Sequence, residues 1–143
     1  MDEKTFKLDM VAPDRIVYKG RVRSFSSPGE LGAFQVLYNH APLLSSLVVG
    51  EIKFTDEDGS TKYYATSGGF VEVRENRVLA LLDAAERADE IDIDRARESK
   101  KRALDRIKSR ASDLDMARAK RSLERANNRL KVAQRTTETA TVS

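Results

Sequence analysis

Six arginines recur at helical spacing in the last third of the chain, and their guanidinium groups could together hold an anion. They fall into two runs, first Arg95 and Arg102, then Arg118, Arg121, Arg125 and Arg129. Side chains three or four residues apart stack on one face of a helix, so the second run forms a basic face. Such a face favours nucleic acid, a nucleotide, a lipid headgroup or an acidic protein surface as partner. The alternative is a helix whose charges only meet solvent.

The charge of the chain is divided unevenly between its two parts. Residues 1–85 carry ten Lys/Arg and twelve Asp/Glu, a net charge of −2, whereas residues 86–143 carry sixteen and eleven, a net charge of +5. The basic part is therefore the one that would attract an anionic partner.

Groups that could perform catalysis or bind a metal are scarce. His40 is the only histidine and cysteine is absent, which excludes a histidine cluster, a thiolate metal site and a disulfide. The G-x-x-G of Gly29 and Gly32 lacks the G-K-[ST] of a phosphate-binding loop. No G-x-S-x-G surrounds Ser67, so a serine nucleophile is not indicated. The sequence therefore predicts a protein that is not an enzyme and binds no metal.

Apolar segments of the length that membranes require are also missing. No apolar run reaches about eighteen residues, so no membrane-spanning helix is expected. Met1–Lys4 precedes no apolar segment of the kind found in secretory signals. The absence of cysteine suits a reducing compartment.

The elements before residue 85 are expected to be short strands. Phe6, Leu8 and Met10 alternate with polar residues, which is typical of a half-buried strand. Similar runs follow, with two strands expected around Gly20, a loop at 27–32, and a hairpin turn at Asp58-Gly59. Eight or nine such strands predict an antiparallel sandwich or barrel.

The basic part is expected to form two helices. Small and apolar residues recur at steps of three and four in the second run, namely Met116, Ala119, Leu123, Ala126, Leu130 and Ala133. This spacing draws a narrow apolar stripe along one helical face. Asp92 and Asp113 are placed to cap the two helices. A connection of about five residues, 109–113, favours an antiparallel hairpin, and the tail after it has no apolar pattern.

Five segments, taken in order, resemble the epsilon subunit of the F-type ATP synthase. They are Gly29-Glu-Leu-Gly32, His40-Ala-Pro42-Leu-Leu44, Gly50, Ser67-Gly-Gly-Phe-Val-Glu-Val73 and Ile91-Asp-x-x-Arg95-Ala96, and the resemblance covers about residues 4–134. It implies a β-sandwich of about ten strands at 1–85, which binds the central stalk, and a regulatory helical hairpin at 86–135. Residues 136–143 are expected to form a disordered tail.

The resemblance implies a non-catalytic subunit that couples proton-driven rotation to ATP synthesis. Its hairpin would move and inhibit ATP hydrolysis. The expected partners are the gamma subunit, the c-ring and, transiently, the alpha and beta subunits, with no nucleic acid and no direct membrane insertion. The expected location is peripheral, on the cytoplasmic face of the bacterial inner membrane.

Two sets of contact residues follow from the resemblance. The contacts to the c-ring and gamma are expected at Glu30, Leu31, His40 and Pro42. The inhibitory contacts to alpha and beta are expected at Arg118, Arg121, Arg125, Arg129 and Lys131.

Some bacterial members of this family bind ATP on the folded hairpin, and the same pattern is present here. The matching residues are Glu86, Ile91, Asp92, Arg95, Arg102, Arg125 and Arg129. ATP would then be a regulatory ligand, and no cofactor would be required. Asp94 departs from the pattern by adding a negative charge. In the alternative, the arginines only meet acidic surfaces of the beta subunits.

Two further alternatives concern function and motion. One is a nucleic-acid-binding β-barrel with a basic helical arm, although Asp and Glu interrupt both helices and the strands lack a run of exposed aromatics. The other is a permanently folded hairpin. An alanine-rich stripe buries few methylene groups, which favours weak docking and a movable arm.

Overall fold

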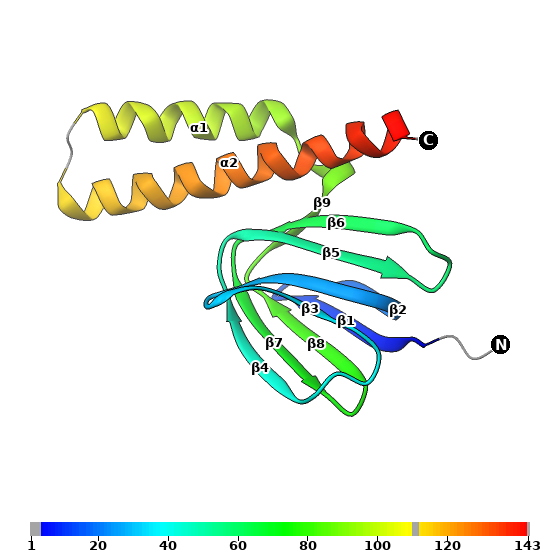
Figure 1. Cartoon of the computed structure of the whole chain (residues 1–143). Helices are drawn as coiled ribbons and strands as arrows, with labels where there is room; N and C mark the ends of the chain where they lie inside the picture. Colours follow the sequence, from blue (N-terminus) through cyan, green and yellow to red (C-terminus); the bar gives the residue numbers. More distant parts are fainter. Residues whose placement is uncertain (1–3, 110–111, 143) are drawn as a thin grey trace. The chain divides into compact units, whose positions relative to one another are not determined.

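The computed structural model describes residues 4–109 and 112–142, the last seven of them by their backbone alone. It divides into two compact units, Met1–Arg87 and Ala88–Ser143. The first unit contains the strands and the second the helices (Figure 1).

Nine strands form the first unit within the described residues, where about ten were expected. They are β1 (Phe6–Ala12), β2 (Arg15–Gly29), β3 (Gly32–Val36), β4 (Leu43–Leu47), β5 (Gly50–Asp56), β6 (Thr61–Thr66), β7 (Gly69–Arg74), β8 (Arg77–Leu82) and β9 (Ala85–Arg87). Hydrogen-bonded neighbours follow the order β1-β8-β7-β4-β2-β5-β6-β9, with β3 on β2 and a further pairing of β1 with β2. Only β1 and β8 run parallel among the described pairs. The predicted β-sandwich is confirmed, with this parallel pair as an exception to its antiparallel pattern.

The alternation seen in the sequence decides which side chains form the core. In β1, Phe6, Leu8 and Met10 are almost fully buried, whereas Lys7 and Asp9 between them are partly exposed. The largest buried side chains of the unit are Phe6, Phe25, Phe54, Leu8, Met10 and Ile52. Because successive strand residues point to opposite faces, each strand that fills the core also presents an outer row.

The strand β2 is longer than the sequence predicts. It runs continuously through Gly20 and includes Ser27–Gly29, where two strands and a loop were expected. The register shifts between Met10 and Val11 and again between Val22 and Ser24. Such irregularities bend a strand, which lets one long strand pair first with β1 and then with β3 and β5.

The predicted Asp58-Gly59 hairpin turn connects β5 and β6. The Asp56 carboxylate accepts hydrogen bonds from the backbone N–H groups of Asp58 at 2.9 Å and Ser60 at 3.0 Å. These bonds lower the pKa of Asp56, and the Ser60 N–H has the largest effect. The Asp58 N–H and the Lys62 ammonium contribute less. The turn is thus fixed by one side chain as well as by Gly59, whose φ is +90°.

The segment before the helices is more ordered than the charged connector expected at 84–90. It contains the short edge strand β9, which pairs with β6. The Arg15 guanidinium donates to the Ala85 carbonyl at 2.7 Å, and the Thr66 hydroxyl donates to the Ala84 carbonyl at 3.0 Å. Two side chains from other strands therefore reinforce the last strand of the first unit.

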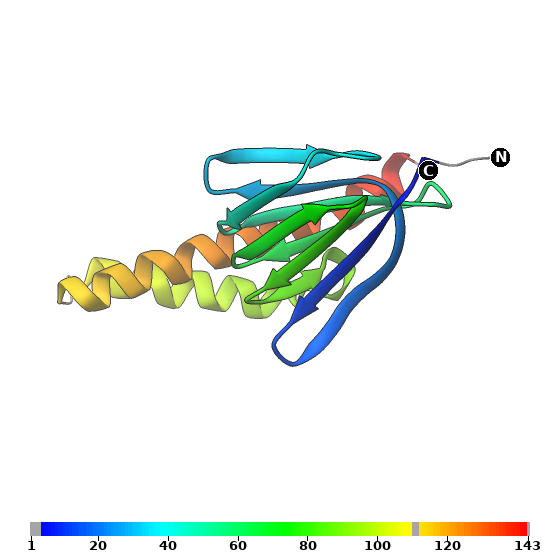
Figure 2. The same cartoon turned by 90° about the horizontal axis from the view of Figure 1, so that it is seen from below.

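The second unit contains the 3-10 helix η1 (Ala88–Glu90), α1 (Ile93–Lys108) and α2 (Asp113–Val142). The helices α1 and α2 lie side by side in both views (Figures 1 and 2). Asp92 caps α1, as predicted, by accepting the backbone N–H of Arg95 at 3.1 Å. The predicted cap of α2 was wrong, because Ser112 accepts the Asp115 N–H there at 3.3 Å. Asp113 lies in the first turn instead, where its charge suits the helix dipole.

The contact between the helices is built on alanine. Ala96 and Ala103 of α1 and Ala119 and Ala126 of α2 are buried, each pair being separated by two helical turns. We call these four alanines the alanine seam. Further along α2, Val132 and Ala133 are buried as well. The larger stripe residues Met116, Leu123 and Leu130 are only half-buried.

The helix α2 continues through Val142. This differs from the disordered tail expected at 136–143, of which residue 143 lies outside the described residues. No proline or glycine interrupts the chain after Asp113. Each threonine costs only a few tenths of a kcal/mol relative to alanine, so an established helix can propagate through them.

We predict that Gly69→Ala destabilises the sandwich more than Gly32→Ala does. Both glycines have positive φ, +143° and +130°, but a Cβ at Gly69 would collide with the Leu81 carbonyl oxygen, whereas one at Gly32 would have no atom within 4 Å. The expected losses in free energy of unfolding are about 2–4 kcal/mol and about 1–2 kcal/mol, respectively. Urea unfolding of the two variants measures both, and equal losses would contradict the proposed collision.

Candidate functional site

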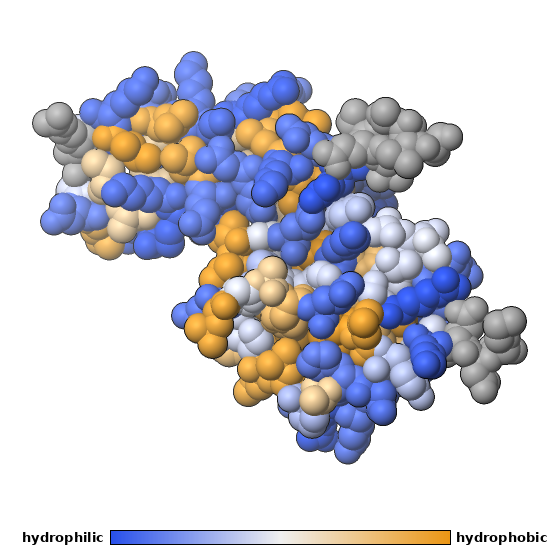
Figure 3. All heavy atoms as spheres, in the orientation of Figure 1, coloured by the Kyte–Doolittle hydropathy of each residue, from blue (hydrophilic) through white to orange (hydrophobic). Residues whose placement is uncertain are grey.

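All six arginines of the predicted anion-binding face lie on the two helices. Arg95 and Arg102 belong to α1, and the others belong to α2. Five of them are exposed and Arg129 is half-buried. The Arg102 guanidinium donates to the Ser99 hydroxyl at 3.2 Å, so that part of its hydrogen-bonding capacity is used within its own helix. On the face that Figure 3 shows, the described surface of the hairpin is largely hydrophilic, with apolar patches between the hydrophilic side chains.

The Ile91–Ala96 segment forms the N-terminal end of α1. Ile91 and Ala96 are buried, so their role is packing. The exposed Asp92 carboxylate accepts a hydrogen bond from the backbone N–H of Arg95. The Arg95 side chain takes no part in this bond and is exposed. The Arg95 side chain could bind an anion here, whereas Ile91 and Ala96 could not contact it because they are buried.

Glu86 belongs to a different unit from the other predicted nucleotide-binding residues. It lies on β9 opposite Ala65, within the first unit. The remaining six belong to the second unit, on α1, α2 or the residues just before α1. Arginines of both runs therefore belong to one unit, and Glu86 belongs to the other.

The four residues predicted to contact the c-ring and gamma lie in the loops at the two ends of β3. Glu30 and Leu31 form the turn before it, and Leu31 is fully exposed. His40 and Pro42 lie in the connection to β4. A five-residue strand spans about 17 Å, so the two pairs cannot meet one small feature of a partner.

The histidine in this group is held locally. Its Nδ1 donates to the Ala41 carbonyl at 2.7 Å, and its backbone N–H donates to the Leu37 carbonyl at 3.2 Å. These bonds fit a residue that shapes its own turn.

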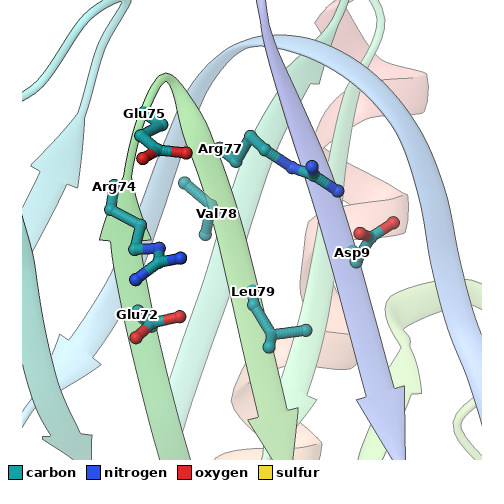
Figure 4. A pocket seen from close by; sticks show the side chains of 7 residues that line it. All are labelled: Asp9, Glu72, Arg74, Glu75, Arg77, Val78 and Leu79. Carbon is teal, nitrogen blue, oxygen red and sulfur yellow. The ribbon is translucent and has the colours of Figure 1, made fainter.

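One concave feature was not found by sequence reasoning. A shallow cavity of about 230 Å³ lies on the outer face of β1, β7 and β8 (Figure 4). It is lined by Asp9, Glu72, Arg74, Glu75, Arg77, Val78 and Leu79. The alternation of each strand assigns most of these side chains to an outer face, but only the register of the sheet brings them together.

The part of the chain that the structure describes offers no group of three or more His, Asp or Glu arranged to hold a metal ion. Over the same residues, no helix combines the length and apolar character needed to cross a bilayer.

Comparisons with known proteins account for both units. Residues 5–88 match the family described as "ATP synthase, Delta/Epsilon chain, beta-sandwich domain", and residues 89–134 match its "long alpha-helix domain". An ATP synthase epsilon chain of Nitratidesulfovibrio vulgaris is 44% identical over 98 residues, which cover 68% of this chain and 72% of that one. The epsilon chain of Pelotomaculum thermopropionicum is also 44% identical, over 101 residues that cover 71% and 75%.

Two solved structures share the fold at low sequence identity. A chain of the Euglena gracilis mitochondrial ATP synthase, in an OSCP/F1/c-ring structure, has a TM-score of 0.79 at 20% identity, with 87% of this chain and 79% of that chain covered. A chain of the Tetrahymena thermophila central stalk/c-ring structure has a TM-score of 0.63 at 12% identity, covering 89% and 95%.

Both parts of the chain, in the order found here, are those of one subunit type, and the two epsilon chains match it over 98 and 101 residues. The chain belongs to the ATP synthase delta/epsilon chain family, as one of its non-catalytic epsilon subunits.

Proposed function

We propose that this chain couples the rotor of an F-type ATP synthase to ATP synthesis and limits ATP hydrolysis through a movable helical hairpin. The sandwich would bind the gamma subunit and the c-ring. The hairpin would contact alpha and beta transiently. The proposed location is peripheral, at the cytoplasmic face of a bacterial inner membrane. The two similar structures, one of an OSCP/F1/c-ring assembly and one of a central stalk/c-ring assembly, support these neighbours.

The observation that carries the regulatory proposal is the alanine seam. Burying one methyl group contributes about 0.8 kcal/mol, so four alanines contribute on the order of 3 kcal/mol. Fully buried leucines would contribute about 1.5–3 kcal/mol each. A switch needs two states within a few kcal/mol of each other, and an alanine seam keeps the helices within that range.

The outer face of α2 supports the proposed inhibitory contacts. Arg118, Arg121 and Arg125 are exposed, and so is Lys131. Charged hydrogen bonds from such residues to carboxylates are stronger than neutral ones. An acidic surface of alpha or beta would therefore hold an extended arm.

ATP is the proposed regulatory ligand of the folded hairpin. Arginines of α1 and α2 belong to one unit, and each charged hydrogen bond to a phosphate contributes about 1.5–3 kcal/mol. At ten times its dissociation constant, a ligand specific for the folded state stabilises that state by about 1.4 kcal/mol. This would shift a balanced equilibrium about tenfold towards the compact hairpin.

Removal of the hairpin is predicted to separate assembly from inhibition. A chain ending at Arg87 keeps the whole first unit, so it should still join the rotor. ATP hydrolysis by the reconstituted complex should rise relative to the complex with the full chain. Circular dichroism of the truncated chain checks its folding, and unchanged hydrolysis by an assembled complex would remove the inhibitory role.

Arginine variants test the nucleotide proposal. Arg125→Ala should weaken ATP binding to the full chain by about tenfold or more, because one charged contact to phosphate is lost. Arg118→Ala is the matched control, since it removes an equally exposed arginine of α2 outside the proposed nucleotide set. Isothermal titration calorimetry measures both affinities. The absence of heat at millimolar ATP, or equal losses in the two variants, would speak against this site.

A further inference from the structure

The connection between β3 and β4, residues 37–42, has little packing to hold its shape. None of its residues is buried, and Tyr38 is 48% exposed. Two of its hydrogen bonds are internal, and both involve His40. Within the described residues, one further hydrogen bond joins it to the rest of the sandwich, from the Asn39 backbone N–H to the Asn76 Oδ1 at 2.7 Å. The conformation of this connection therefore depends on Asn76.

Residues 37–40 form a type II turn. The His40 N–H donates to the Leu37 carbonyl at 3.2 Å, and of the two central residues only Asn39 has a positive φ, +58°. In the commoner type I turn, φ of the third residue is negative and the peptide group between the two central residues is turned over by about 180°. The direction in which the Asn39 N–H points therefore distinguishes the two types.

The Asn76 side chain holds this peptide group in the type II orientation. Its Oδ1 accepts the Asn39 N–H, which would point away from Asn76 in a type I turn. Because the N–H and C=O of a trans peptide point in opposite directions, the same bond directs the Tyr38 carbonyl away from Asn76. A positive φ is unfavourable for residues other than glycine, and this hydrogen bond offsets that cost.

The other end of the Asn76 amide is bonded to the start of the sandwich. Its Nδ2 donates to the Thr5 carbonyl at 3.0 Å, and the Arg21 guanidinium donates to the same carbonyl at 3.2 Å and to the Thr5 hydroxyl at 3.0 Å. Turning the amide over would place its amino group against the Asn39 N–H and its oxygen against the Thr5 carbonyl, so these contacts fix its orientation. A carboxylate could not make both bonds, because it has no donor.

The backbone of Asn76 belongs to a tight hairpin turn. Glu75 and Asn76 are the central residues between β7 and β8, flanked by the paired residues Arg74 and Arg77. Both have positive φ, +50° and +57°, as a type I′ turn requires. Glycine suits the second central position of this turn, so Asn76→Gly keeps the hairpin and removes the side-chain bonds.

We propose that Asn76 is a positioning residue for the contact that this chain makes through the β3–β4 connection. Its amide selects the type II turn and thereby sets how the Tyr38 carbonyl, His40 and Pro42 face a partner. Asn76 acts through Asn39 and does not touch the partner itself. This inference rests on the proposed function for the identity of the partner, the c-ring and gamma.

The turn type is measured by NMR on the full chain. The Hα of Tyr38 lies closer to the amide proton of Asn39 in a type II turn than in a type I turn, so the nuclear Overhauser effect between them reports the type. Asn76→Gly should weaken this signal. It should also speed hydrogen exchange of the Asn39 amide by about threefold to tenfold, because one hydrogen bond is lost.

Glu75→Gly is the matched control for the turn. It places glycine at the other left-handed position of the same hairpin and leaves the Asn76 amide unchanged. Both signals of Asn39 should then stay as they are in the unmodified chain. Exchange of the buried Val71 amide in β7 confirms in each variant that the sheet is intact.

Binding of the full chain is measured by biolayer interferometry on detergent-solubilised ATP synthase from which this subunit has been removed. The affinity falls with the fraction of molecules that keep the competent turn, so Asn76→Gly should weaken binding by about threefold to tenfold. Asn39→Gly in the same chain should restore the affinity to within about twofold, because glycine favours the positive φ of a type II turn. Thr61→Val removes a hydroxyl contact with Thr55 elsewhere in the sandwich and should leave the affinity unchanged.

The outcomes separate this inference from the proposed function. If the unmodified chain does not bind, the proposed function fails and the partner contact with it, whereas the NMR signals still decide whether Asn76 selects the turn. If it binds and Asn76→Gly leaves either the Asn39 signals or the affinity unchanged, only the positioning role is overturned. A loss of affinity that Asn39→Gly does not restore would also overturn it, because Asn76 would then act by another route.

Discussion

The two-residue period of the strands is the constraint on which the sandwich depends. It directs Phe6, Leu8 and Met10 into the core and leaves Lys7, Asp9 and Val11 on the opposite face. Because the core must be filled, the outer residues cannot change sides, and the sheet registers then align them into rows. Packing of the core therefore also decides which charged and apolar side chains lie on the outer face, although those side chains do not pack in the core.

The interiors of the two units are packed differently. The sandwich buries phenylalanines and branched side chains almost completely, whereas the buried side chains described on α1 and α2 are alanines, with Val132 as the exception. Large buried side chains resist separation, since each would expose apolar area worth about 1.5–3 kcal/mol. One unit is therefore suited to hold a fixed position on a partner and the other to change conformation.

Periodicity predicted the sandwich, the alanine stripe and the Asp92 cap, because each depends on residues that are close in the sequence. It did not predict the continuity of β2, which depends on irregular pairing with strands on both sides. The choice of Ser112 over Asp113 as a cap was also missed, since both residue types cap helices well. The placement of the arginines on helices was predicted, but the cavity beside Asp9 was not, because its lining comes from strands distant in the sequence.

The short strand β9 has a mechanical consequence. A pull on the backbone at Arg87 acts on β9, whose start is held by hydrogen bonds from Arg15 to Ala85 and from Thr66 to Ala84. Those ties attach the start of β9 to β2 and β6, so this end of the strand is held even when Arg87 is pulled away from Tyr64. The end of the first unit is therefore anchored to two strands of the sandwich, and it is not a slack tether.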